Sequence, residues 1–192
     1  MSRDEKSPAG SKSVHIGQVS GNVYLGERPE HSVDAAINEL LLSLANQPFA
    51  FERTNRRPSA QTIEKIHYNN IQSKSHIIKQ YLDHSAKIEE AFNSIDSIIT
   101  FGKHIILQSL NDLYCSALDA VGIDYLTGPV NTASVRENSE FILDFIIKQL
   151  RNTAFEAKNT PALKEHIDLG VNVVVAHAFI ECIILENPNN DS

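Results

Sequence analysis

Apolar residues recur at helical spacing over most of the chain. Between residues 33 and 44 they lie three or four positions apart, so they share one face of an α-helix. Ser32 can cap the start of this helix, and Pro48 follows its expected end. The pattern predicts a helix whose apolar stripe is formed by Val33, Ala36, Ile37, Leu40, Leu41 and Leu44.

The same spacing predicts a second helical stretch after Pro58, with Ser59 as its capping residue. A polar run at residues 69–73 interrupts this stretch, because Asn and Ser favour caps and turns over helix interiors. Helical spacing resumes at Ile77 and continues to Ile99. We therefore expect a broken pair of helices in this part of the chain.

Further apolar stripes predict a helix over about residues 98–121 that stops at Gly122, since glycine commonly ends helices. A loop over residues 128–138 should separate it from a helix around Phe141–Leu150. A final helix is expected to run to about Glu186.

Residues 171–185 of that final helix are apolar on nearly every side, which places them at the centre of a bundle. Cys115 and Cys182 both fall in predicted core helices, so we expect two buried structural thiols. His177 and Glu181 stand four positions apart in the same helix. They form either a satisfied buried pair or a polar feature that fixes helix register or a partner contact.

The N-terminal part differs from the rest. Residues 1–13 have the composition of a disordered tail, whereas residues 14–31 alternate like a short β-hairpin with a turn at Ser20-Gly21-Asn22. A lone hairpin is marginal in water, so we interpret it as an association element that makes a homo-oligomer. A disordered tail and a flap on the chain's own bundle are the alternatives. The predicted oligomerisation residues are Val14, Ile16, Val19, Val23, Tyr24 and Leu25.

These elements together predict an all-α fold, a helical bundle of about five major helices over residues 32–188 with a short N-terminal β-hairpin. The chain has 192 residues, of which 42% are hydrophobic, enough for a sizeable core. The most apolar run, residues 171–185, is shorter than the roughly 20 residues that span a bilayer, and residues 1–13 do not resemble a secretory signal. We therefore expect a cytoplasmic protein that does not engage a membrane.

The net charge of −7 argues against direct nucleic-acid binding, but it is unevenly distributed. Residues 52–80 carry six basic and two acidic side chains, whereas residues 81–192 carry seven basic and sixteen acidic ones. This basic edge is either an ordinary solvated helix face or a surface that receives an acidic partner or a phosphate.

Known catalytic patterns are missing from the sequence. It holds neither a Gly-rich phosphate loop nor a Gly-x-Ser-x-Gly elbow, and its eight His show no His-x-x-x-His spacing. We predict a protein that is not an enzyme, with no catalytic residue, no metal site and no cofactor.

Two short stretches resemble a known family. Residues 58–70, Pro-Ser-Ala-Gln-Thr-Ile-Glu-Lys-Ile-His-Tyr-Asn-Asn, are followed by Ile77, Ile78 and Tyr81. They look like the opening of a helical C-terminal domain of bacterial ABC-three-component conflict systems. Residues 178–188, Ala-Phe-Ile-Glu-Cys-Ile-Ile-Leu-Glu-Asn-Pro, look like the closing motif of the same domains. We refer to these as the opening stretch and the closing stretch.

The resemblance implies an adaptor that couples or oligomerises partner proteins in antiviral defence, an ABC-type ATPase and an effector of the same system among them. The predicted partner-binding residues are Lys65, Tyr68, Asn69 and Asn70, whose donors and acceptors can tie a helix break to a neighbour or a partner. A capped helix kink is the purely structural interpretation. A stand-alone antitoxin, inhibitor or scaffold that masks a partner is the alternative function.

Overall fold

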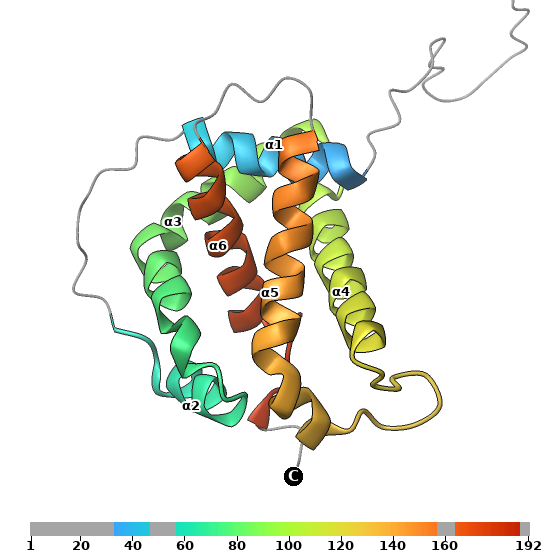
Figure 1. Cartoon of the computed structure of the whole chain (residues 1–192). Coiled ribbons are helices and arrows are strands. Elements are labelled where there is room, and N and C mark those ends of the chain that lie inside the picture. Colours follow the sequence, from blue (N-terminus) through green and yellow to red (C-terminus); the bar gives the residue numbers. More distant parts are fainter. Residues whose placement is uncertain (1–32, 47–56, 157–163, 189–192) are drawn as a thin grey trace, which may run out of the picture. The chain divides into compact units, whose positions relative to one another are not determined.

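A computed structural model describes residues 33–46, 57–156 and 164–188. Over these residues the chain is helical and contains no strand, which confirms the all-α prediction for this part (Figure 1). The predicted tail at residues 1–13, the predicted hairpin at 14–31 and its six oligomerisation residues lie outside the described residues. The helices are α1 (Val33–Asn46), α2 (Ala60–Tyr68), a 3-10 turn (Gln72–Lys74), α3 (Ser75–Ile98), α4 (Gly102–Ala120), α5 (Thr132–Glu156) and α6 (Lys164–Ile180).

Helix α6 is the centre of the bundle, as its all-round apolar pattern predicts. It packs against α1, α3, α4 and α5. In Figure 1 it lies between α3 and α5, with α1 crossing near the ends of both. Its side chains are buried on several faces at once, and Phe179 is only 1% exposed. Burial of apolar surface on this scale is the main force that holds the bundle together.

Helix α2 begins and ends where the sequence predicts. Ser59 caps it, because its Oγ accepts a hydrogen bond from the backbone N–H of Thr62 at 3.1 Å. After Tyr68 the backbone turns at Asn70, whose φ of 54° lies in the left-handed region. Ile71 is buried beyond the turn, and α3 then starts at Ser75. The polar run is therefore a true break between two helices.

Three helices of the described part, α2, α4 and α6, end in the same hydrogen-bonded turn, a Schellman motif. In this motif one residue adopts a left-handed conformation and the next residue donates back to a carbonyl five positions earlier. The left-handed residues are Asn70 (φ 54°), Gly122 (φ 72°) and Cys182 (φ 59°). The closing bonds run from Ile71 N to Ile66 O at 3.1 Å, Ile123 N to Leu118 O at 3.0 Å and Ile183 N to Ala178 O at 2.9 Å.

Two helix ends in the C-terminal half differ from the sequence prediction. Helix α6 stops at Ile180 rather than near Glu186, because the turn at Cys182 breaks the helical hydrogen-bond ladder. Cys182 is consequently exposed, so its prediction as a buried core thiol is wrong. Helix α5 begins at Thr132, inside the predicted loop, since Asn131 caps it by accepting from the N–H of Ser134 at 3.1 Å.

Helix α4 begins at Gly102, four residues later than predicted, because a tight turn joins it to α3. Phe101 occupies a left-handed conformation there, with φ of 62°. A Cβ on Gly102 would lie 2.4 Å from Cγ2 of Ile95, so only glycine fits this close approach. None of the described helices is long and apolar enough to cross a membrane.

Candidate functional site

The opening and closing stretches of the family resemblance meet in space, although more than a hundred residues separate them. We call their contact the junction; it consists of Lys65, Tyr68 and Asn69 from the end of α2 with Phe179 and Glu186 from the chain around the end of α6. Direct hydrogen bonds join the two sides. The sequence predicts neither this contact nor its partners.

Lys65 enters the junction as a buried cation. The residue is only 4% exposed, and its Nζ donates a hydrogen bond to the carbonyl oxygen of Phe179 at 2.5 Å. The same Nζ lies 4.5 Å from the centre of the Phe179 ring, a cation–π contact. Burial lowers the pKa of Lys65, while Cys182 and Glu186 partly oppose that shift.

Asn69 joins the backbone of the closing stretch in the way that one β-strand pairs with another. It is 0% exposed, its Nδ2 donates to the carbonyl of Glu186 at 2.8 Å, and its Oδ1 accepts from the N–H of Glu186 at 3.1 Å. The Nδ2 group also donates to the carbonyl of Lys65 at 2.9 Å. One side-chain amide thereby satisfies both backbone groups of a residue in a non-helical segment.

Two more side chains brace the junction from α4 and α5. Arg136 donates through Nε to the carbonyl of Tyr68 at 2.5 Å, and its guanidinium lies 4.7 Å from the centre of the Tyr68 ring. Tyr114 donates its hydroxyl to Oε1 of Glu186 at 2.9 Å. Burial raises the pKa of Tyr114 far above its ordinary value, and the nearby Glu186 carboxylate adds to the shift. Nothing in the sequence pattern singles out Arg136 or Tyr114.

A hollow of about 160 Å³ opens beside the junction. It has room for only a few water molecules, so it suits a small group rather than a large ligand. Both stretches line it, and its walls include Ser59, Thr62, Glu64, Lys65, Phe179, Cys182 and Asn187.

The four predicted partner-binding residues therefore share one place but differ in exposure. Lys65 and Asn69 are buried and bind the chain's own backbone, Tyr68 is half-buried under Arg136, and Asn70 is exposed. The structure thus shows how Lys65 and Asn69 tie the end of α2 to another segment of the same chain. Their role in partner binding stays a prediction.

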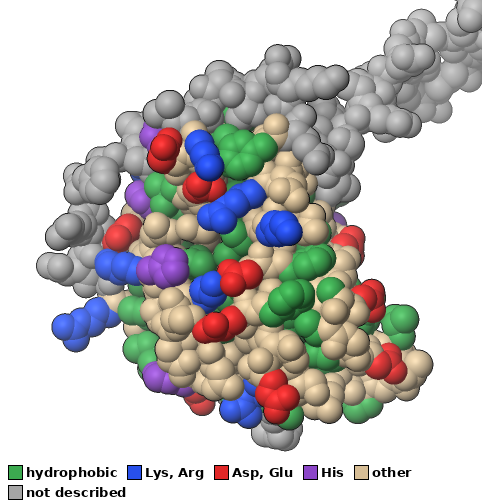
Figure 2. Space-filling view, viewed as in Figure 1, with side chains coloured by type: hydrophobic (Ala, Val, Ile, Leu, Met, Phe, Trp, Pro, Cys, Tyr) green, Lys and Arg blue, Asp and Glu red, His purple; other side chains and the backbone are tan. Residues whose placement is uncertain are grey.

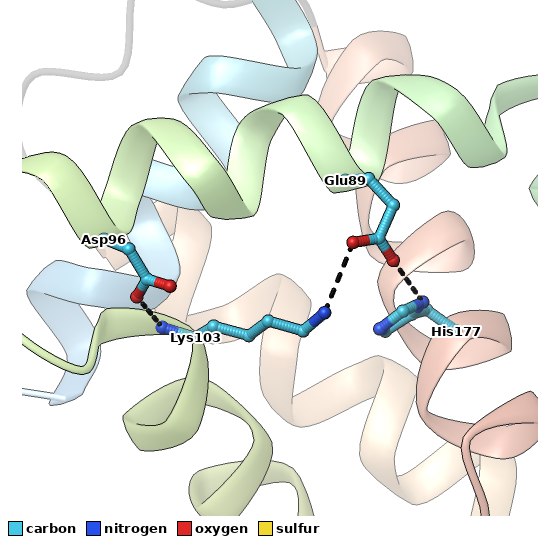
Figure 3. A network of polar contacts seen from close by, with 4 residues as sticks. All are labelled: Glu89, Asp96, Lys103 and His177. Carbon is cyan, nitrogen blue, oxygen red and sulfur yellow. Dashed lines mark hydrogen bonds and ion pairs between the residues drawn. The ribbon is translucent and has the colours of Figure 1, made fainter.

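A second polar cluster lies where α3, α4 and α6 meet; its charged side chains are exposed and its histidine is buried (Figure 3). Glu89 stands between Lys103, whose Nζ is 3.3 Å from its Oε2, and His177, whose Nδ1 is 4.0 Å from its Oε1. Asp96 accepts from the backbone N–H of Lys103 at 2.8 Å, which helps to cap α4. The helical spacing predicts Glu181 as the partner of His177, whereas the carboxylate within 4.0 Å of its ring is Glu89 from α3. The charge of Glu181 also acts on the imidazole.

His177 itself is 0% exposed and is packed between two aromatic rings, with ring centres 5.1 Å from Phe92 and 5.8 Å from Tyr81. Neither of its ring nitrogens has a hydrogen-bond partner within the described part. Burial lowers the pKa of His177; Glu181 and Glu89 oppose this shift, and Lys103 reinforces it. The lowered pKa favours the neutral form of the imidazole.

The three lysines of the basic edge bind other groups of the chain itself. Of its lysines, Lys65 is buried in the junction, Lys74 pairs with Asp144 at 2.6 Å, and Lys79 pairs with Asp83 at 2.8 Å. These contacts leave less free positive charge for an acidic partner than the sequence count indicates.

The face shown in Figure 2 carries charges of both signs together with apolar side chains that gather over α4 and α5. Elsewhere, large apolar side chains stand exposed at turns, with Phe101 73% and Leu126 81% exposed. Among the described residues, no three His, Cys, Asp or Glu side chains are placed to share a metal ion.

The described residues define an all-helical bundle with a buried, hydrogen-bonded junction at one end. No family model, no curated protein and no solved structure matches this chain.

Proposed function

We propose that this protein is a non-catalytic adaptor of a bacterial defence system, which couples an ABC-type ATPase to an effector. One observation carries the proposal: the opening and closing stretches, which suggest the family independently, form a single junction. Two stretches that meet can build one surface, whereas two separated stretches cannot.

The junction supports this role because its buried residues hold its shape and its exposed residues are accessible to a partner. Lys65 and Asn69 hold α2 against the closing stretch and fix its orientation. Glu64, His67 and Asn70 are exposed on the same helix and its turn, where a partner can reach them. We call these three residues the rim. Because these bonds hold the backbone of α2 and its turn in place, the rim needs little ordering on binding, which favours a defined docking surface.

Reconstitution with the ATPase and effector encoded beside this protein's gene tests the proposal. The rim variants are His67→Ala and Asn70→Gly; glycine removes the amide of Asn70 while tolerating its left-handed backbone. Lys148→Ala, an exposed change on α5, is the matched control. We expect the wild type and the control to co-elute with the ATPase, and the double rim variant to lose the complex with its helical spectrum unchanged.

Retention of the complex by the double rim variant would contradict docking at the junction. A gene neighbourhood without an ABC-type ATPase would contradict the coupling role itself. Homo-oligomerisation through residues 14–31 is a separate proposal. Deleting residues 1–27 should reduce the mass measured by light scattering to that of a monomer while the helical spectrum persists; an unchanged mass would refute it.

A further inference from the structure

Cys182 occupies a backbone position that favours glycine. It is the left-handed residue of the Schellman motif after α6, with φ of 59°. The equivalent positions after α2 and α4 hold Asn70 and Gly122, the two residue types common there. Its exposed thiol gains little from packing in return for the strained backbone. Neither the backbone conformation nor packing therefore explains why this position holds a cysteine, and the chemistry of its sulfur is what remains.

Cys182 and the amine of Lys65 meet at one carbonyl oxygen. Nζ of Lys65 donates to the carbonyl of Phe179 at 2.5 Å, and the backbone N–H of Cys182 donates to the same carbonyl at 3.3 Å. Both residues also line the hollow beside the junction. Two more contacts hold the sulfur in place: Nδ2 of Asn187 donates to Sγ at 3.6 Å, and the thiol donates to the carbonyl of Ile180 at 3.7 Å. A solvent-accessible sulfur is thus fixed beside a buried nitrogen.

The amine of Lys65 is suited to react with an oxidised sulfur. Its burial lowers its pKa, so a larger fraction of it carries the free lone pair that a nucleophile needs. A thiol oxidised to a sulfenic acid condenses with a nitrogen that lies close to it. Since the amine is held at the junction by Phe179, it stays near the sulfur instead of sampling solvent.

We propose that Lys65 and Cys182 are an oxidant-responsive cross-linking pair, in which hydrogen peroxide joins α2 to the closing stretch through a sulfur–nitrogen bond. The thiolate of Cys182 first attacks peroxide; a sulfur–oxygen bond forms, the oxygen–oxygen bond breaks, and hydroxide leaves and is protonated to water. The sulfur is oxidised by two electrons and the peroxide is reduced. The Lys65 nitrogen then attacks the sulfur, the sulfur–oxygen bond breaks, and hydroxide leaves with a proton from the nitrogen as a second water.

Peptide mapping of the full-length protein after peroxide treatment tests the proposal. Trypsin should fail to cut after Lys65 and should release residues 57–74 joined to residues 165–192, two hydrogens lighter than the sum of the separate peptides. A thiol reductant should restore both peptides. The oxidised protein should also melt at a higher temperature than the reduced one, because the bond closes a long loop of chain.

Two variants serve as controls. Cys115→Ser removes the other thiol, which lies half-buried on α4, and should leave the cross-link unchanged. Cys182→Gly suits the left-handed backbone and should abolish the cross-link without loss of the fold. The proposal is overturned if wild-type Cys182 is recovered as a sulfinic or sulfonic acid with Lys65 free, or joined to any other lysine. Mapping of the wild type decides this without a variant at Lys65.

Discussion

Replacing Asn69 by alanine should destabilise the protein, because it breaks the contact between the opening and closing stretches. The substitution removes the amide that pairs with both backbone groups of Glu186, at 2.8 and 3.1 Å. Asn69 follows α2 as its C-cap, so the change leaves every residue of the helix in place. The loss therefore reports on the contact between the opening and closing stretches rather than on the helix.

The magnitude follows from the groups left behind. Each hydrogen bond contributes about 1 kcal/mol net, and a buried backbone group without a partner costs about 1–3 kcal/mol. The carbonyl of Lys65 keeps its bond from the backbone N–H of Asn69, so the N–H and C=O of Glu186 bear the loss. Glu186 is partly exposed, and water can rehydrate some of it. We expect the free energy of unfolding to fall by about 2–4 kcal/mol.

Urea unfolding followed by far-ultraviolet circular dichroism measures the change. Asn69→Asp should be at least as damaging at neutral pH, because its second oxygen would face the carbonyls of Lys65 and Glu186 in place of a donor. Asn70→Gly, one residue along, is the control and should not destabilise the protein. An Asn69→Ala variant within about 0.5 kcal/mol of the wild type would refute the idea that this amide holds the junction.

Three further predictions concern the core and the helix ends. Phe179→Ala should lower stability by about 3–5 kcal/mol, since the ring is 1% exposed on the central helix; an unchanged thermal melt would contradict that placement. Cys182→Gly should raise stability by about 1 kcal/mol and Gly122→Ala should lower it by a similar amount, as both sites are left-handed. Urea unfolding checks this pair, and shifts of equal sign would speak against the shared turn. The folded-state pKa of His177 is below its ordinary 6.5, so the wild type should lose stability as the pH falls below that value. His177→Leu should flatten this dependence in urea titrations at neutral and mildly acidic pH, and an unaltered slope would exclude His177 as its source.

The features that sequence analysis predicts correctly are those governed by neighbours in the chain. The apolar stripe of α1 repeats every three or four residues, so local geometry alone identifies it. Ser59 caps α2, and Gly122 forms the turn after α4, through hydrogen bonds to residues three positions away in the chain. The break at Asn69 and Asn70 follows from the same local preferences.

The features that it misses depend on competition between local and distant contacts. Residues 181–185 are apolar enough to continue a helix, yet Ile184 and Leu185 bury their side chains from a turn instead. That turn exposes Cys182, which the helical pattern places in the core. The bonds from Lys65 to Phe179 and from Asn69 to Glu186 join segments that only the packed bundle brings together. No spacing rule along the chain contains that information.

The position of α6 has a consequence for synthesis on the ribosome. The helices that pack on α6 are all made before it, so the apolar faces that they turn toward α6 stay uncovered until it emerges. The hydrogen bonds of Lys65 and Asn69 cannot form until Phe179 and Glu186 have been synthesised, a delay on the order of ten seconds at typical rates of translation. During that interval the nascent bundle exposes apolar surface that chaperones recognise. A stop codon just before α6 should therefore yield an aggregating fragment, not a smaller folded domain.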